Sequence, residues 1–563
     1  MHNGLKAVLA AAALMLCGAQ APAPDAVEYE LTPIMRSGAL QAVQIDLRFR
    51  GEADGETPIR LPESWGGESE LWRTIQELRV VSGGALSNGV GPTQRIVTHR
   101  PNARLHLRYR IVQDFEGAPS AEQGNTYRPV VQPDYFHLIG EAVFVSPEEG
   151  DLNGPLRVRM RNLPRGWTFA SDLQHGPLTL DRLWSSVMVG GDFRIVERAA
   201  QNVRIAIRGD FAFTDEHFAG EVGNIISAHR SFFGDPASPY LITVIELVTP
   251  QPGWRSIGGT GLGDAFAFFA TPNAEGMQIT RILAHEGLHT WIPREIGGMP
   301  AEGEAAHYWF SEGFTDFYTG RILVRDGMWT PQQFADELNQ ILQGYALSPA
   351  RDYPNARIAA DFWNDQDIER LPYKRGRLLA TMWDARLRAE GRDLDEVILE
   401  MRRRAQAGDP LKAAELFPVV MQSFDQDISE DIATHVDAGA RVVLAEDTFG
   451  ACGRVVTETV AVFDRGFDAE ALQNNNLIIS GVDPQSNAYA AGLRDGMLFV
   501  RRDAGEIGNS QIPITYVVRD GDTERAITYL PAGRTSYERQ RLVLADDLEG
   551  ERLAQCRAVL GGG

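Results

Sequence analysis

Two histidines four positions apart, with a glutamate beside the first, stand in residues 283–292, LAHEGLHTWI. On a helix, His285 and His289 would lie on one face and could bind the same cation. Glu286 would lie about 100° around the helix from His285, where it can take a proton from a water molecule on the metal. Catalytic zinc sites use neutral imidazoles, a third His or a carboxylate, and water in the fourth position. The stretch therefore predicts two ligands for one Zn²⁺ and a general base, and it requires a third ligand from elsewhere.

The third ligand determines the class of zinc site. One class of zinc peptidases uses HExxHxxGxxH, but Ile292 and Glu295 stand where that pattern has Gly and the last His, which excludes it. His307 is a possible ligand. Glu312 is the stronger candidate, because it lies in the aromatic segment YWFSEGFTDFY, where a charge is costly to bury without a partner. The chain between His289 and Glu312 is long enough for a loop and a second helix.

Asp316 follows Glu312 by four residues and would lie on the same helical face. Metal-bound histidines usually donate their other ring N–H to a carboxylate or a carbonyl. We expect Asp316 to accept this bond from His285. The alternative is an exposed helix carboxylate.

The elements that must position these residues fall into regions of different pattern. Residues 26–190 are strand-like, because apolar and polar residues alternate with period two between clusters of turn residues. We predict an N-terminal all-β domain there. Its clearest expected strands are 41–50, 104–112, 142–146 and 156–163.

Residues 191–440 should carry the site. Strands are expected at 203–209 and 240–248, with a helix between them over 220–233. After Thr271 apolar residues recur at helical spacing, so this domain is predicted to be mainly helical. The longest expected helices cover 330–347, 374–391 and 394–408.

Strand-like patterning returns in residues 450–535. Within it, 474–500 predicts a strand, a turn, a short helix and a second strand. The tail, residues 536–563, could contain a final helix. Together these patterns predict an α+β multidomain chain.

Composition limits the class of protein. The chain has 563 residues, with 44% hydrophobic and 23% charged residues and a formal net charge of −22. Such an acidic chain without a Lys/Arg cluster is a poor candidate for binding nucleic acid or anionic membranes. After the N-terminus no segment approaches 18 uncharged apolar residues, so no transmembrane segment is predicted.

The N-terminus predicts export. Lys6 precedes an apolar run over residues 7–17, which is too short to span a bilayer, and we expect residues 1–21 to be a signal peptide. The protein would then be periplasmic or secreted. A lipid anchor at Cys17 is less favoured, because Leu16 stands where a lipoprotein signal has a small residue. Cys452 and Cys556 remain, and they either pair or are two separate buried thiols.

HEGLHTW followed by WFSEGFTDFY resembles the glycyl aminopeptidase family. That family belongs to the zinc peptidases with two His and one Glu as ligands, the gluzincins. The resemblance implies one zinc ion per chain on His285, His289 and Glu312. It also implies an N-terminal β domain, a thermolysin-like catalytic domain and a C-terminal PDZ domain, which would cover almost the whole mature chain.

Two further segments take roles from the resemblance. Related aminopeptidases carry Tyr-x-Lys-Gly, here Tyr373-Lys-Arg-Gly, whose tyrosine hydrogen-bonds the tetrahedral intermediate. A Gly-rich strand lines the substrate groove, here GGTGLGDAFAFFA (258–270). Asp264 is the only acid in this stretch, where the family pattern carries Glu. The substrate-binding residues implied are Gly258, Gly259, Gly261 and Asp264.

The segment SGVDPQSNAYAAGLRDGM (480–497) resembles part of a PDZ domain. By that resemblance the backbone amides of residues 464–468 would receive the carboxylate of a peptide C-terminus beside an open strand edge. A merely structural β domain is the alternative.

The sequence thus predicts a zinc-dependent peptidase that hydrolyses peptide substrates with metal-activated water and acts as an aminopeptidase. One alternative is a zinc endopeptidase with the same site. Another is an inert peptidase fold that binds peptides through its PDZ-like domain.

Overall fold

The computed structural model describes residues 26–121, 125–148, 155–176, 178–249, 254–300, 302–474 and 476–562. The expected signal peptide, with Cys17, lies outside the described residues. The chain divides into two compact units. The first is mostly the chain up to Ile195, and the second is mostly the chain from Arg255 onward. The residues between are shared: Ala206–Gly209 and Ile245–Trp254 belong to the first unit, Val196–Ile205 and Asp210–Val244 to the second.

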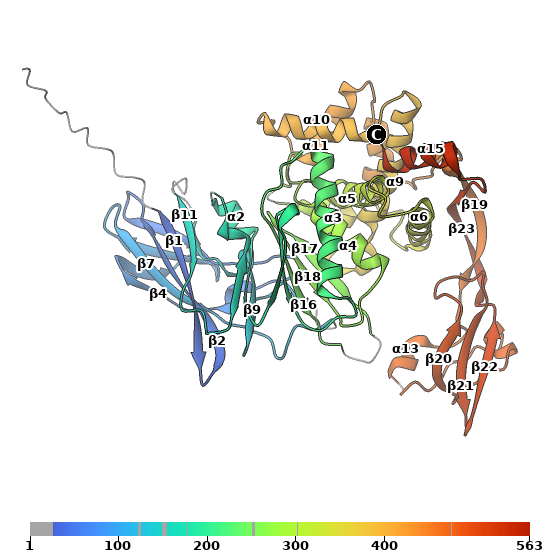
Figure 1. The fold of residues 1–563 in the computed structure, drawn as a ribbon, viewed down its shortest axis with the longest axis horizontal. Helices are drawn as coiled ribbons and strands as arrows, with labels where there is room; N and C mark the ends of the chain where they lie inside the picture. Colours follow the sequence, from blue (N-terminus) through green and yellow to red (C-terminus); the bar gives the residue numbers. More distant parts are fainter. Residues whose placement is uncertain are drawn as a thin grey trace, which may run out of the picture. The chain divides into compact units, whose positions relative to one another are not determined.

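The first unit is built from β-sheets (Figure 1). One sheet has the order β11-β1-β2-β7-β4 and includes three of the expected strands. Alternate residues of β1 are buried, as a sheet with one face on the core requires. The bounds in this sheet are β1 (Val27–Arg36), β2 (Ala39–Arg50), β4 (Ile75–Ser82), β7 (Arg104–Ile111) and β11 (Leu156–Met160).

Two four-stranded sheets complete this unit, with the orders β10-β3-β6-β5 and β12-β13-β9-β8. Their strands are β3 (Glu56–Arg60), β5 (Gly84–Asn88), β6 (Gln94–His99), β8 (Val130–Gln132), β9 (Tyr135–Ile139), β10 (Ser146–Pro147), β12 (Thr168–Ser171) and β13 (Val187–Gly191).

The strand expected at 142–146 is wrong except at its last residue, Ser146, which lies in β10. This segment begins in the short helix α1 (Gly140–Val143), and Phe144 N–H donates to Gly140 O at 3.0 Å, which closes the helical turn. All five residues are buried, so they show no true alternation. A short apolar run of this kind does not distinguish a strand from a buried helical turn.

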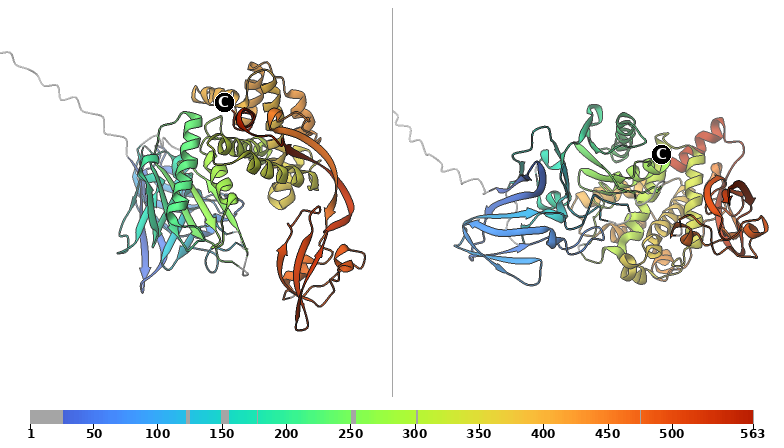
Figure 2. Two further views of the ribbon diagram at one scale, coloured as in Figure 1. Left: turned by 45° about the vertical axis from the view of Figure 1, so that its right-hand side comes forward. Right: turned by 90° about the horizontal axis from the view of Figure 1, so that it is seen from below.

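Most of a five-stranded sheet of order β14-β15-β16-β18-β17 belongs to the second unit. β17 is its edge strand and pairs antiparallel with β18. Helices α3 and α4 lie along this sheet (Figures 1 and 2). The bounds are β14 (Arg194–Arg198), β15 (Val203–Arg208), α3 (Asp215–Phe233), β16 (Tyr240–Glu246), β17 (Ile257–Gly261), β18 (Ala265–Ala270) and α4 (Met277–Leu288).

The rest of this unit is mainly helical up to residue 437. Thr330 caps α6 in a capping box with Gln333, and Pro331 occupies the first turn, so the sequence itself starts this helix. Almost every residue of α5 is buried, which makes it the central helix. The main helices are α5 (Tyr308–Arg325), α6 (Pro331–Leu347), α9 (Leu371–Ala389), α10 (Leu394–Gln406) and α11 (Ala413–Ser423).

The C-terminal part begins with a two-stranded ribbon of β19 (Gly453–Phe463) and β23 (Ala532–Leu544). Between these strands lies a sheet of order β20-β21-β22, with its own apolar core. The first strand expected within 474–500 is wrong, because the described residues there make only an isolated bridge, Ile478 to Leu498. Asn476 and Leu477 have positive φ angles, which interrupts extended pairing. The bounds are β20 (Leu498–Ala504), β21 (Ile514–Asp520), β22 (Thr523–Tyr529), α13 (Ala469–Asn474) and α14 (Asn487–Ala490).

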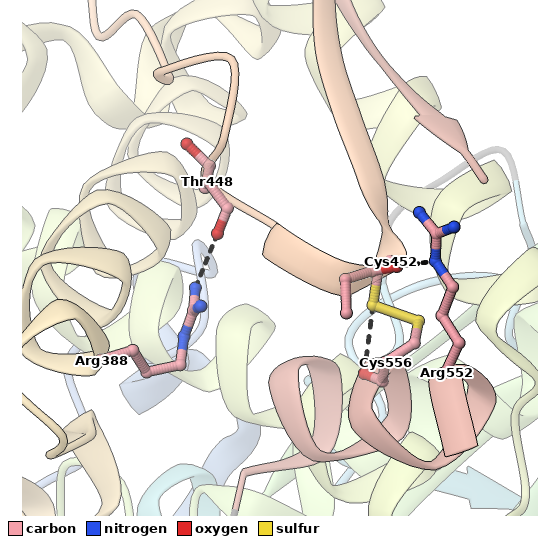
Figure 3. Close-up of a disulfide and its surroundings, with 6 residues drawn as sticks. Arg388, Thr448, Cys452, Arg552 and Cys556 are labelled. Atoms are coloured by element: carbon pink, nitrogen blue, oxygen red, sulfur yellow. Dashed lines mark hydrogen bonds between the residues drawn. A yellow bond between two sulfur atoms is a disulfide. The ribbon is translucent and has the colours of Figure 1, made fainter.

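A disulfide joins Cys452 to Cys556, with a Cα–Cα distance of 4.5 Å (Figure 3). Cys452 precedes β19, and Cys556 lies on the C-terminal helix α15 (Gly550–Gly561). Arg325 Nε of α5 donates to Gly561 O at 2.8 Å, so α15 packs on α5. The disulfide therefore links the two ends of the segment that contains the ribbon and the small sheet. None of the described helices is long and apolar enough to cross a membrane.

Candidate metal centre

Helix α4 places the two histidines of HExxH on one face. His285 lies in its last turn, and His289 follows as the C-cap in helical conformation. The ring centroids are 5.0 Å apart. Ile279, Leu283 and Leu288 are buried, so the apolar side of α4 anchors the helix. The four-residue spacing of the two histidines is therefore one turn of a helix, as the sequence predicted.

Glu312 projects from α5 toward both histidines. Its Oε2 lies 3.2 Å from His285 Nε2 and 3.4 Å from His289 Nε2. The three ligand atoms are all within 4.8 Å of one another. The structure thus brings together the three side chains predicted as metal ligands, although α4 and α5 are separate in the sequence.

The second ring nitrogen of each histidine already faces an acceptor. His285 Nδ1 lies 2.8 Å from Asp316 Oδ1, and His289 Nδ1 lies 2.9 Å from the Ile292 carbonyl oxygen. With the protons on Nδ1, the lone pairs on both Nε2 atoms point toward Glu312. Two imidazole nitrogens and one carboxylate are a donor set that suits catalytic Zn²⁺, which takes water as its fourth ligand.

The electrostatics of the three side chains also favours a cation. Burial lowers the pKa of His285, but Asp316 and Glu312 outweigh it and raise that pKa to about 10. Burial raises the pKa of Glu312, yet the two histidines hold it well below its usual value. A divalent cation would compete with protons for the imidazole nitrogens, which couples binding to proton release.

Glu286 lies beside this cluster and meets the edge strand β17. Its Oε2 accepts a 2.9 Å hydrogen bond from Gly261 N–H. Burial raises the pKa of Glu286, while His289 and His285 lower it, and the net shift is upward. A carboxylate with a raised pKa is suited to take up and return a proton near neutral pH.

Of the residues expected to bind substrate, Gly261 has the closest contact with the site. A Cβ there would lie 2.5 Å from Glu286 O and 2.7 Å from His289 Cβ, so only glycine fits. At Gly259 a Cβ would meet the Phe266 ring, whereas Gly258 faces open space.

Asp264 lies in the turn between β17 and β18 and is not one of the three converging ligands. Burial raises the pKa of Tyr240, and the charge of Asp264 raises it further. The Tyr240 hydroxyl lies 3.2 Å from Thr290 Oγ1. The charge of Asp264 therefore acts on Tyr240 of β16.

Tyr373, in the first turn of α9, lies against His285. The two ring centroids are 5.9 Å apart, at an interplanar angle of 26°. Burial raises the pKa of Tyr373 well above its usual value, and the charges of Glu312 and Glu286 add to this shift. The phenol therefore keeps its proton and can donate it in a hydrogen bond beside the site.

Sequence reasoning did not find the groups that hold Asp316. Its Oδ1 accepts from Arg281 Nη2 at 2.6 Å, in addition to facing His285. Arg281 in turn contacts Glu337 of α6. The only local signal is that Arg281 precedes His285 by one helical turn, and nothing in the spacing points to Glu337.

A comparison with protein families supports this site. Residues 278–370 match the family described as M61 glycyl aminopeptidase. The matched segment contains HExxH, Glu312 and Asp316. This chain resembles the M61 glycyl aminopeptidases. Together with the converging donors, the match supports a hydrolytic peptidase.

A solved structure shares the fold. An aminopeptidase N family protein from Idiomarina loihiensis matches with a TM-score of 0.66 and 16% identity, over 95% of this chain and 100% of that chain. An M1 zinc metallopeptidase from Deinococcus radiodurans matches at 16% identity and a TM-score of 0.47, over 75% of this chain and 95% of that chain. The first match shows the fold of a β domain followed by a mainly helical part. No curated protein matches the chain significantly in sequence.

Proposed function

We propose that this protein is a zinc-dependent peptidase and that it acts as an aminopeptidase. The observation that carries the proposal is the convergence of His285 Nε2, His289 Nε2 and the Glu312 carboxylate, with both Nδ1 atoms held by acceptors. The resemblance to M61 glycyl aminopeptidases supports the choice of peptide substrates.

These three residues would hold one Zn²⁺. When bound, the ion would lower the pKa of a water molecule to roughly 7 and polarise the scissile carbonyl. Glu286, fixed by Gly261 N–H, accepts the proton of the attacking water and passes it to the leaving amine. The Tyr373 hydroxyl donates a hydrogen bond to the carbonyl oxygen as negative charge develops there.

The edge strand β17 is the proposed platform for the peptide. One of its sides pairs with β18, and its Gly261 end contacts the general base. An extended peptide could add to such an edge through main-chain hydrogen bonds. Gly258 would then lie along the bound peptide and leave room for a side chain.

Two measurements test the proposal directly: the zinc content of the protein and its requirement for a free N-terminus in the substrate. The purified protein should contain one zinc per chain, and Glu286→Gln should abolish hydrolysis while retaining the metal. An aminopeptidase cleaves a peptide with a free N-terminus and leaves its N-acetylated form intact. Cleavage of both forms would instead identify an endopeptidase with the same site.

We also propose that residues 450–535 form a PDZ-like domain that binds peptide C-termini. In the expected carboxylate loop, Gly466 N–H already donates to Asp464 Oδ1 and Asp468 N–H to Ser480 O. A peptide carboxylate would therefore depend on the amides of Arg465 and Phe467. Binding of a labelled peptide that is lost when its C-terminus is amidated would support this role, and equal binding of both forms would exclude it.

We further propose that the protein is exported to the periplasm or secreted. The disulfide between Cys452 and Cys556 supports an oxidising compartment, because cytosolic thiols are kept reduced. Cell fractionation, with thiol alkylation before and after reduction, would test both the location and the bond.

A further inference from the structure

Four charged groups, three of them buried and one half-buried, adjoin the candidate metal centre. They are Arg281 of α4, Asp316 of α5, Glu337 of α6 and Arg377 of α9. The Asp316, Glu337 and Arg377 side chains are 3%, 6% and 1% exposed, and Arg281 is 35% exposed. Two positive and two negative groups from four helices thus balance one another.

Glu337 is the centre of this group. Its Oε1 accepts from Arg281 Nε at 3.0 Å and from Arg377 Nη1 at 2.9 Å. Its Oε2 also lies 2.6 Å from Arg377 Nη2, which makes the second contact a close ion pair. Glu337 therefore holds two guanidinium groups that come from different helices.

Each partner of Glu337 stands one helical turn from a residue of the site. Arg281 precedes His285 by four residues on α4, and Arg377 follows Tyr373 by four on α9. Arg377 Nη1 also donates to the Asp316 backbone oxygen at 2.9 Å. Glu337 therefore helps to fix the helical turns that carry the metal ligand His285 and the phenol of Tyr373.

The charges explain why Glu337 matters for His285. Asp316 Oδ1 is shared between Arg281 Nη2 at 2.6 Å and His285 Nδ1 at 2.8 Å. Without Glu337, the guanidinium groups of Arg281 and Arg377 would both act on the Asp316 carboxylate and draw it from the imidazole. The surplus positive charge would also oppose a divalent cation at the site.

We propose that Glu337 is a positioning residue for the metal centre, because it engages Arg281 and Arg377 and so leaves Asp316 free to orient His285. This inference rests on the proposed zinc site. A purely structural ion pair would stabilise the fold without changing the affinity for metal.

The same helix supplies a matched control. Asn339 lies on α6 and pairs with the Leu542 backbone: its Nδ2 donates to Leu542 O at 3.0 Å, and its Oδ1 accepts from Leu542 N–H at 2.7 Å. Asn339→Ala removes two hydrogen bonds of α6 without touching the four charges. It reports what a loss of helix anchoring alone does to metal binding.

The test measures the Kd for zinc by competition with a chromophoric chelator, on variants shown to be folded by circular dichroism. We expect Glu337→Gln to bind zinc about 10- to 100-fold more weakly and Asn339→Ala to bind like the wild type. Adding Arg281→Gln to Glu337→Gln removes the unbalanced guanidinium and should recover at least tenfold of the affinity. If the two substitutions only damaged the structure independently, the double variant would lose the sum of the two binding free energies.

Wild-type affinity in folded Glu337→Gln, an equal loss in Asn339→Ala, or a further loss in the double variant would overturn the inference. If Glu337→Gln does not fold, Glu337→Asp replaces it: its shorter carboxylate should weaken zinc binding at least threefold, and unchanged affinity would contradict the role. His285→Ala separates the two hypotheses. If the wild type binds zinc no better than His285→Ala, the proposed function itself fails.

Discussion

Gly261 N–H donates a 2.9 Å hydrogen bond to Oε2 of Glu286, so the edge of the sheet fixes the proposed general base. The strand can approach this closely because Gly261 has no side chain. A Cβ would lie 2.5 Å from Glu286 O, which is backbone and part of α4. Strand β17 and helix α4 therefore meet at Glu286, the residue proposed to transfer the proton.

Gly261→Ala should separate β17 from α4. The displaced Glu286 would lose its fixed position, and we expect kcat/KM for a dipeptide amide to fall about 100-fold, as a shift of about 1 Å can cause. Gly220→Ala on α3 is the control, because a Cβ there meets no atom within 4 Å. Equal activity of both variants would show that the contact does not position the base.

Tyr373→Phe removes the hydroxyl and keeps the ring beside His285. A phenol that stabilises only the developing oxyanion should affect kcat far more than KM, and we expect kcat to fall about 100- to 1000-fold. Zinc content should stay unchanged, because the ring packing is retained. Steady-state kinetics checks this split, and a change in KM alone would assign Tyr373 to substrate binding instead.

Some of the site could be predicted from local spacing. His285 and His289 converge because they are four apart on one helix, and Glu312 attracts notice as a charge within an aromatic segment. Arg281 and Glu337 carry no such signal. Their contact depends on how α4 and α6 pack, and a single sequence does not show that packing.

The fold shows the same limit. Long periodic segments such as 330–347 became helices, because capping and periodicity agree there. The run 142–146 is buried on all sides, so its pattern could not distinguish helix from strand. The disulfide could not be decided either, since pairing depends on where α15 docks on α5.

Removing the disulfide should loosen the C-terminal segment. A disulfide stabilises a folded protein by about 2–4 kcal/mol in most cases. Cys452→Ser with Cys556→Ser should therefore lower the free energy of unfolding by that amount in urea. Because α15 packs on α5, protease cleavage after residue 540 should also become faster.

Wild type with and without reductant is the control. Identical unfolding curves for the wild type and the double variant would contradict a stabilising role of the disulfide.

His229 should make the protein less stable in mild acid. It is buried on α3, its ring packs edge-on against Trp291 at 5.7 Å, and burial followed by the charge of Arg230 lowers its pKa to about 3. In the unfolded chain the pKa is about 6.5. A depressed folded pKa gives a contribution that is complete above pH 6.5 and is lost as the pH falls from 6.5 toward 3.

Between pH 7 and pH 5 this linkage corresponds to about 2 kcal/mol. Urea unfolding of the wild type and of His229→Gln at the two pH values isolates it, because all other titrating groups are common to both proteins. The variant should lose about 2 kcal/mol less stability than the wild type over this interval. An equal loss in both would mean that His229 binds a proton in the folded state, and its ring nitrogens would then need a partner that the packing against Trp291 does not provide.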